Sequence, residues 1–211
     1  MTVNPVGLAG NWELVFQDNF SDIREDAGDK WTVTDWKMNN ILSNPKNVWT
    51  YDGKLVLNLE SAESGVHIVS KTQRITPGMV VEAKIKFPGD GKIVYNWPAF
   101  WTAGVKYPDS GEHDIAEGLD SLKVSYWSSK KTLDFSSRPD EIWTDAYHVF
   151  TLHRGKASGS VRWDGQRVGL YGTNDDGGPE YICLTLGSRG TVITGLASRV
   201  RVDYVRAWKP A

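Results

Sequence analysis

The sequence predicts an all-β protein, a single antiparallel β-sandwich whose curved sheet leaves a concave face as a cleft for a long ligand. Three observations support this fold class. Short runs rich in aromatic and β-branched residues recur along the chain, 21 glycines supply turns between them, and no pattern predicts a helix longer than two turns. The 211 residues fit one domain, and no repeat or linker divides residues 1–211.

The expected strands follow one another with turn residues between them. Asp52-Gly53 and Asp164-Gly165 are dipeptides typical of two-residue hairpins. The segment 79–87 alternates in its second half, as a half-buried strand does. We expect strands at residues 12–16, 48–51, 54–59, 79–87, 97–103, 112–117, 123–127, 147–153, 160–163, 167–171, 181–186 and 199–208.

Charge and hydropathy narrow the range of partners. A net charge of −2 and a pI near 6.1 give no positive field for nucleic acid or an anionic membrane surface. No hydrophobic stretch approaches the length of a membrane helix. We expect a monomer that binds neither nucleic acid nor a membrane. Cys183 is the sole cysteine, and its apolar surroundings predict a buried structural thiol.

The start of the chain, residues 1–5, lacks the basic and apolar regions of a signal peptide. We nevertheless expect action outside the cell or at its surface. Either the signal has been removed or the protein leaves its cell by another route.

Three acids, Glu112, Asp114 and Glu117, lie close together in the segment 111–118. In a helix the two glutamates would point about 140° apart. In a regular strand Glu112 and Asp114 share one face, whereas Glu117 points to the core, where an isolated carboxylate is costly. One extra residue, a β-bulge at Ile115-Ala116, turns Glu117 onto the face of the other two.

The spacing that results suits glycoside hydrolysis. The α-carbons of Glu112 and Glu117 would lie about 13 Å apart, and inward-leaning side chains leave a gap compatible with the roughly 5–5.5 Å of a retaining glycosidase. One glutamate then attacks the sugar, while the other protonates the leaving oxygen and later activates water. Crowding raises the pKa of at least one carboxyl, and Asp114 can share a proton with a neighbour. The alternatives are a solvated acidic strand face and a calcium site.

An aromatic stretch precedes the acids. Trp97, Ala99 and Trp101 share one face of the expected strand. On a cleft face, the two tryptophans would form a floor on which sugar rings stack. The alternative is that they fill the core of the sandwich.

Together these segments resemble glycoside hydrolase family 16, the group that contains laminarinases, lichenases and agarases. The family is marked by a strand of Trp-Pro-Ala-Phe-Trp type, here residues 97–101, followed by Glu-x-Asp-x-x-Glu, here residues 112–117. The likeness covers nearly the whole chain. Further similar segments are residues 12–20, 47–57, 81–88 and 202–206.

The resemblance implies a concanavalin-like β-jelly roll and a retaining mechanism with no cofactor for catalysis. It assigns Glu112 as the nucleophile, Asp114 as its helper and Glu117 as the general acid/base. It places Trp97 and Trp101 at the subsites next to the cleavage point. A further sugar-contacting residue is implied at Asn40.

The resemblance also implies a structural calcium ion on the convex side of the sandwich. Its ligands would be Asp203 and backbone oxygens near Asn19 and Gly53, since calcium prefers oxygen. The alternative role of Asp203 is a salt bridge to a neighbouring arginine.

Three positions depart from the family pattern. His113 replaces an apolar residue, and we expect a satisfied buried imidazole rather than a catalytic group. Tyr126 stands near the usual position of a histidine, so it is expected to hydrogen-bond the sugar or the acid instead. Thr185 replaces an asparagine.

We therefore expect a retaining endo-glycoside hydrolase that cleaves a β-linked polysaccharide, most simply a laminarin-type β-1,3-glucan. Two alternatives remain open. One is a non-catalytic carbohydrate-binding module on the same sandwich, and the other is a transglycosylase. The partner is a polysaccharide in each case.

Overall fold

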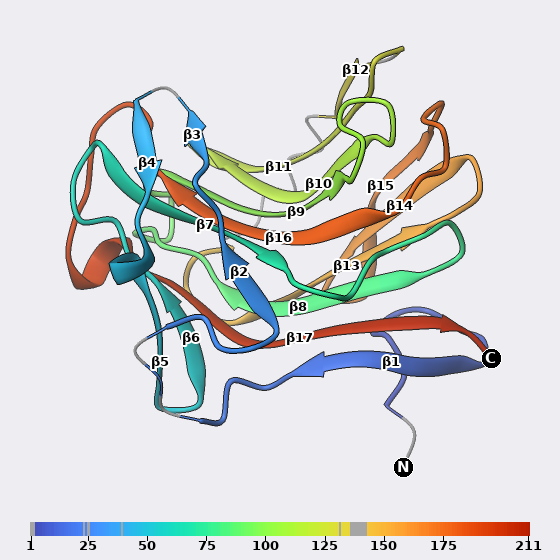
Figure 1. Cartoon of the computed structure of the whole chain (residues 1–211), viewed down its shortest axis with the longest axis horizontal. Coiled ribbons are helices and arrows are strands. Elements are labelled where there is room, and N and C mark those ends of the chain that lie inside the picture. The colour runs from blue at the N-terminus through green and yellow to red at the C-terminus, as the bar shows by residue number, and fades with distance from the viewer. Residues whose placement is uncertain (1–2, 23, 25, 39, 131, 136–142) are drawn as a thin grey trace.

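Two curved β-sheets stack face to face in the computed structural model, which describes residues 3–22, 24, 26–38, 40–130, 132–135 and 143–211 (Figure 1). The convex sheet has the order β15-β14-β13-β8-β17-β6-β5, with β1 paired to β17. Its strands are β1 Trp12–Asp18, β5 Val48–Tyr51, β6 Lys54–Leu57, β8 Val80–Lys86, β13 His148–Arg154, β14 Ser158–Trp163, β15 Gln166–Gly172 and β17 Val200–Pro210.

The second sheet has the order β12-β11-β10-β9-β16-β7-β4-β3, with β2 paired to β7. The strands at its two ends, β3 and β12, curve away from the convex sheet, so that the outer face of this sheet is concave (Figure 1). Among the described strands, β4 and β7 form the one parallel pair. The strands are β2 Trp31–Val33, β3 Lys37–Met38, β4 Ile41–Ser43, β7 Ser64–Ser70, β9 Trp97–Gly104, β10 Glu112–Leu119, β11 Ser121–Trp127, β12 Thr132–Phe135 and β16 Glu180–Gly187.

The predicted all-β sandwich is confirmed, and every expected strand is present with ends shifted by up to two residues. Five strands, β2, β3, β4, β7 and β12, were not predicted from the sequence. The most important is β7, a central strand that is buried along most of its length and so shows no alternation. The described residues contain two short 3-10 helices, η1 Pro45–Asn47 and η2 Leu196–Ser198. None of the helices seen there is long and apolar enough to span a membrane.

The two predicted hairpin turns are present, between β5 and β6 and between β14 and β15. Asp52 and Gly53 have φ values of 51° and 63°, and Asp164 and Gly165 have φ values of 46° and 81°. Positive φ at both central residues matches the twist of the flanking strands, and Asp-Gly tolerates that conformation best.

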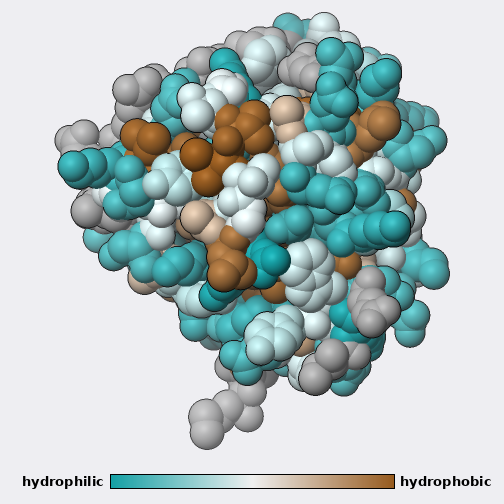
Figure 2. Space-filling view, turned by 90° about the vertical axis from the view of Figure 1, so that its left-hand side faces the viewer, coloured by the Kyte–Doolittle hydropathy of each residue, from teal (hydrophilic) through white to brown (hydrophobic). Residues whose placement is uncertain are grey.

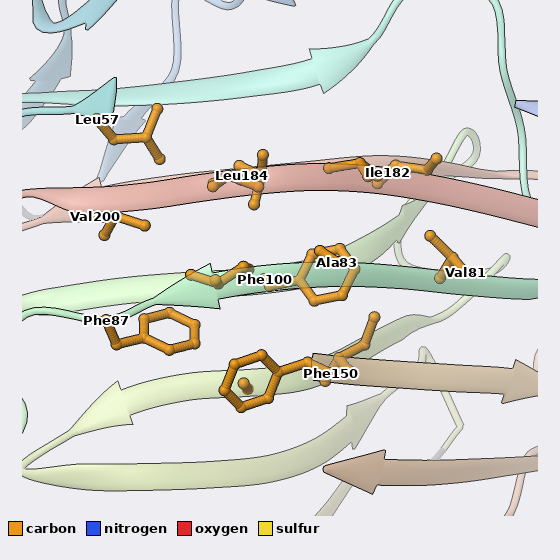
Figure 3. Packing of buried hydrophobic residues seen from close by; sticks show 14 of the residues in the cluster. Leu57, Val81, Ala83, Phe87, Phe100, Phe150, Ile182, Leu184 and Val200 are labelled. Atoms are coloured by element: carbon orange, nitrogen blue, oxygen red, sulfur yellow. The ribbon is translucent and has the colours of Figure 1, made fainter. Parts of the chain in front are cut away.

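The core lies between the sheets. Leu57, Ala83 and Phe150 from the convex sheet meet Phe100 and Leu184 from the concave one (Figure 3). Cys183 is also fully buried, and burial raises the pKa of its thiol, as expected for a structural residue. Because side chains alternate along a strand, each core-facing residue leaves its neighbours for the outer face.

One end of the molecule carries apolar surface. The side that faces left in Figure 1 shows hydrophobic side chains gathered in its upper half, toward β3 and β4, with hydrophilic ones around them (Figure 2). Met38 of β3 and Leu42 of β4 are 42% and 53% exposed. Exposed hydrophobic side chains therefore lie next to the cleft described below.

Candidate active site

The three acids lie on β10, which carries the predicted bulge. Against β9, Glu112 pairs with Ala103, Asp114 with Trp101 and Glu117 with Ala99, so one extra residue is accommodated after Asp114. The register with β11 shifts at the same place. Ile115 and Ala116 are both fully buried, and Glu117 therefore returns to the outer face. The bulge at Ile115-Ala116 is confirmed.

Each of two acids receives a hydrogen bond from a neighbouring strand. The Ser125 hydroxyl of β11 donates to Asp114 Oδ2 at 2.5 Å. The Trp97 indole of β9 donates to Glu117 Oε1 at 2.7 Å. These bonds fix the orientation of both carboxyl groups within the row.

The cluster resists losing all its protons. Burial, followed by the charges of Glu117 and Glu180, raises the pKa of Glu112 to about 7. Burial and then the charges of Glu112 and Glu117 raise the pKa of Asp114 well above its ordinary value. Because the carboxyl groups interact strongly, their protons belong to the cluster as a whole. The cluster therefore retains a proton near neutral pH.

The acids form one wall of a cleft of about 280 Å³ on the concave face. Aromatic and apolar side chains provide most of the remaining lining, which suits a ligand with C–H faces and hydroxyl edges. The cleft is lined by Trp36, Met38, Trp97, Ala99, Trp101, Ala103, Tyr107, Glu112, Asp114, Glu117 and Thr185.

The tryptophans predicted to contact sugar face this cleft rather than the core. Trp101 donates its indole N–H to Thr185 Oγ1 at 2.9 Å, so Thr185 orients a lining residue. Trp36, which lies in the connection between β2 and β3, also lines the cleft and was not predicted from the sequence. Its ring centroid is 6.5 Å from that of Trp97 and 5.2 Å from that of His67.

The prediction that Tyr126 hydrogen-bonds the sugar or the catalytic acid is wrong. Tyr126 is fully buried, and its hydroxyl donates to Asp175 Oδ2 at 2.9 Å, away from the three acids of β10. The register explains the error, since Asp114 pairs with Ser125 and the next residue along β11 points the other way.

His113 is a buried imidazole, as predicted, but only one of its ring nitrogens is satisfied. Its Nδ1 lies 2.8 Å from the Tyr171 hydroxyl, with which it is hydrogen-bonded. Its Nε2 lies 3.4 Å from Glu180 Oε1 and has no hydrogen-bond partner among the described residues. Arg154 lies 3.0 Å from the same Glu180 oxygen and 3.1 Å from Asp175. This polar network lies in the core beneath the row of acids.

Asn40 does not line the cleft. It is exposed at the turn between β3 and β4, with a φ of 68° that asparagine tolerates better than most residues. Its contact with a sugar stays a prediction.

The predicted calcium ligands do not fit that ion. The two carboxylate oxygens of Asp203 each lie 2.9 Å from an ammonium group, one of Lys54 and the other of Lys84. Lys54 Nζ also lies 3.3 Å from the Gly53 carbonyl, the second predicted ligand. Asn19 lines a separate pocket that does not include Asp203. Among the described residues, no group of three or more His, Cys, Asp or Glu is placed to hold a metal.

The alternative role of Asp203, a salt bridge, is the one the structure shows, although its partners are lysines and not the expected arginine. Partial burial works to raise the pKa of Asp203, but the hydrogen bonds and charges of the lysines outweigh it and keep that pKa below its ordinary value. Two ammonium groups thus supply the positive charge that a cation would supply.

We expect the protein to be indifferent to calcium. A chelator such as EDTA should leave the midpoint of thermal unfolding unchanged, because lysines already neutralise Asp203. Lys54→Met should cost no more than about 1 kcal/mol, since the pair is partly exposed. A midpoint that falls with EDTA and recovers with added calcium would contradict this assignment.

The chain is similar to known proteins in its structure. No family model and no curated protein matches the sequence. An endo-β-1,3-glucanase from Pyrococcus furiosus matches at 20% identity over 98% of each chain, with a TM-score of 0.75. β-Agarase B from Zobellia galactanivorans matches at 16% identity over 99% of this chain and 98% of its own, with a TM-score of 0.77.

A third solved structure, a non-specific endo-β-1,3(4)-glucanase from family GH16, matches at 19% identity over 99% of this chain and 95% of its own, with a TM-score of 0.75. At such identities the likeness concerns the backbone. It establishes that this chain has the jelly-roll sandwich fold of these glycoside hydrolases.

Proposed function

We propose that this chain is a retaining endo-glycoside hydrolase that cleaves a β-linked polysaccharide, with a laminarin-type β-1,3-glucan as the expected substrate. One observation carries the proposal. The bulge brings Glu112 and Glu117 to the same face of β10, at the wall of a cleft lined by tryptophans. A solvated acidic strand face would not require this register shift. Crowding three carboxylates in a half-buried cleft is unfavourable because they repel one another, so the arrangement suggests a function.

The register supports a retaining mechanism. Glu112 and Glu117 are four β9 positions apart, from Ala103 to Ala99, which corresponds to about 13 Å between α-carbons. Side chains that lean toward each other would leave a gap compatible with the roughly 5–5.5 Å of a retaining enzyme. An inverting enzyme would need a larger gap to hold a water between carboxylate and sugar.

In the proposed first step, the Glu112 carboxylate attacks the anomeric carbon. The bond from that carbon to the glycosidic oxygen breaks while the Glu117 carboxyl gives its proton to the departing oxygen. In the second step, the Glu117 carboxylate takes a proton from water. The resulting oxygen attacks the anomeric carbon and releases Glu112, which leaves every group as it began.

The neighbours of the acids suit these steps. The indole N–H of Trp97 points to Glu117 Oε1 and stabilises the carboxylate that forms when Glu117 loses its proton. Asp114, held by Ser125 between the two glutamates, keeps a proton available to the row because its pKa is raised. Glu112 can then carry the negative charge that attack requires.

The cleft suits a polysaccharide. Flat indole faces accept the C–H faces of sugar rings, and the lining of Trp36, Trp97 and Trp101 offers several such faces on one side of the acids. Solved structures with a similar backbone support a glucan ligand. One was crystallised with laminaritriose and laminaritetraose, and another with 1,3-β-D-cellobiosyl-cellobiose.

A glycan panel tests the proposal. Laminarin, lichenan, agarose and a β-1,4-glucan are incubated with the protein, and new reducing ends are counted. We expect the wild-type protein to release reducing ends from laminarin and the Glu112→Gln variant to release none. Binding of a glycan without release would instead support the non-catalytic module. Added acceptor sugars, followed by product analysis, separate hydrolysis from transglycosylation at this same site.

A further inference from the structure

We propose that Trp163 is a positioning residue that holds the bulge of β10 and thereby the orientation of Glu117. This inference rests on the proposed function. Trp163 ends β14, in the convex sheet, and its side chain crosses the core to the concave sheet. Its indole N–H donates to the Ile115 carbonyl at 2.9 Å, in a contact that is completely buried.

The bulge leaves Ile115 in need of a partner. Among the described strands, Ile115 has no register partner on either side, since the β9 register passes from Asp114 to Ala116 and the β11 register from Asp114 to Glu117. Ile115 is fully buried, so water cannot reach its carbonyl. A buried carbonyl left unsatisfied costs about 1–3 kcal/mol. The Trp163 indole removes that cost only when the bulge is at Ile115.

The packing around Trp163 fixes the orientation of its side chain. It is fully buried and pairs with Phe150 across β13 and β14. Its ring meets those of Trp143 and Phe150 edge to face, with centroids 5.0 and 5.6 Å apart. Aromatic pairs in this geometry resist rotation, so the N–H stays directed at one carbonyl.

The consequence concerns parity. If the bulge moved or closed, every residue beyond it would change faces, because a one-residue slip reverses the orientation of a strand's side chains. Glu117 is the first such residue that bears on the chemistry. The indole on the opposite sheet therefore favours the one register in which Glu117 faces Glu112.

Trp208 offers a matched control. It too is fully buried, and its indole N–H donates to a backbone carbonyl, that of Val3, at 2.7 Å. Trp208 lies on β17 and touches no part of β10 through this bond. Trp163→Phe and Trp208→Phe each delete one N–H···O=C bond while keeping an aromatic ring. We expect both variants to lose unfolding free energy in urea, Trp208→Phe the less, because Val3 is 42% exposed and water can reach its carbonyl.

Only Trp163→Phe should affect the acids. We expect its kcat on laminarin to fall by about tenfold to a hundredfold, as a misplaced catalytic group does, with KM changed far less. The pH profile of kcat/KM should also shift, because the spacing of the carboxyl groups sets their pKa values. Trp208→Phe should keep both the wild-type kcat and the wild-type profile.

A second readout does not depend on activity. The indole N–H resonance of Trp97, which is hydrogen-bonded to Glu117, should move in Trp163→Phe and stay in place in Trp208→Phe. If the wild-type protein cleaves no glycan, the proposed function fails and this resonance alone decides the role of Trp163. If Trp163→Phe does not fold, 3-benzothienylalanine at position 163 keeps the indole shape without the N–H. Equal kcat, profile and resonance in the Trp163 and Trp208 variants would overturn the proposal.

Discussion

Glu112→Gln is expected to abolish glycan cleavage, lowering kcat by at least about a thousandfold, because an amide cannot form the glycosyl ester. The side chain keeps its size, so substrate binding should persist. Isothermal titration with laminarin oligosaccharides should therefore show binding by a variant that releases no reducing ends. Residual cleavage near the wild-type rate would exclude Glu112 as the nucleophile.

The same variant is expected to be more stable than the wild type at alkaline pH. Burial and neighbouring charges raise the folded-state pKa of Glu112 from 4.5 to about 7. Between those values the folded protein holds a proton that the unfolded chain has released. The contribution of Glu112 to stability is therefore complete below pH 4.5 and is lost as the pH rises to about 7.

Glutamine does not ionise, so Glu112→Gln should escape this loss. The variant should gain up to about 3 kcal/mol over the wild type at pH 8 and little at pH 4. Urea unfolding at both pH values measures the difference. If the unfolding free energies of the two proteins changed equally with pH, the pKa of Glu112 would not be raised in the folded state.

Glu117→Ala is the second variant with a large expected effect. Without its acid, cleavage of laminarin should fall by about 10²–10⁴-fold. An aryl glucoside with a good leaving group should lose much less in the first step, since its leaving oxygen needs no proton. Added azide, which needs no base, should then restore turnover and yield a β-glycosyl azide.

The reciprocal variant serves as the control. Azide with Glu112→Ala should attack the free face of the sugar and yield the α-glycosyl azide. If the two variants give the opposite azides, the roles of Glu112 and Glu117 are exchanged. If azide rescues neither variant, the two-step mechanism is wrong.

Much of the fold was predictable because alternation and turn chemistry are local properties. Asp52-Gly53 and Asp164-Gly165 mark hairpins by backbone preference alone. The strand β7 was missed because it is covered on both faces, so its sequence carries no alternation. Its run of Val66, Ile68 and Val69 around His67 was the available signal.

The acidic row was predictable for a different reason. A buried, unpaired Glu117 is so costly that the sequence admits few alternatives to a bulge. Tyr126 was misplaced because its face depends on the register of β11 against β10, which the sequence does not fix. Trp36 was missed because it lies outside any strand.

Contacts between distant segments were beyond the sequence. Trp163 and Ile115 are 48 residues apart and lie on different sheets. Likewise, Lys84 reaches Asp203 only because β8 and β17 are neighbours in the convex sheet. Such pairs follow from sheet order, which no local pattern encodes.

The configuration of the first product tests the central claim most directly. Laminarin is cleaved inside an NMR tube, and the anomeric protons of the new reducing ends are followed before mutarotation proceeds. Two successive displacements at the anomeric carbon, first by Glu112 and then by water, retain the configuration. The β-anomer should therefore appear first and the α-anomer only later. An α-anomer that appears first would mean a single displacement, and Glu112 would not be the nucleophile.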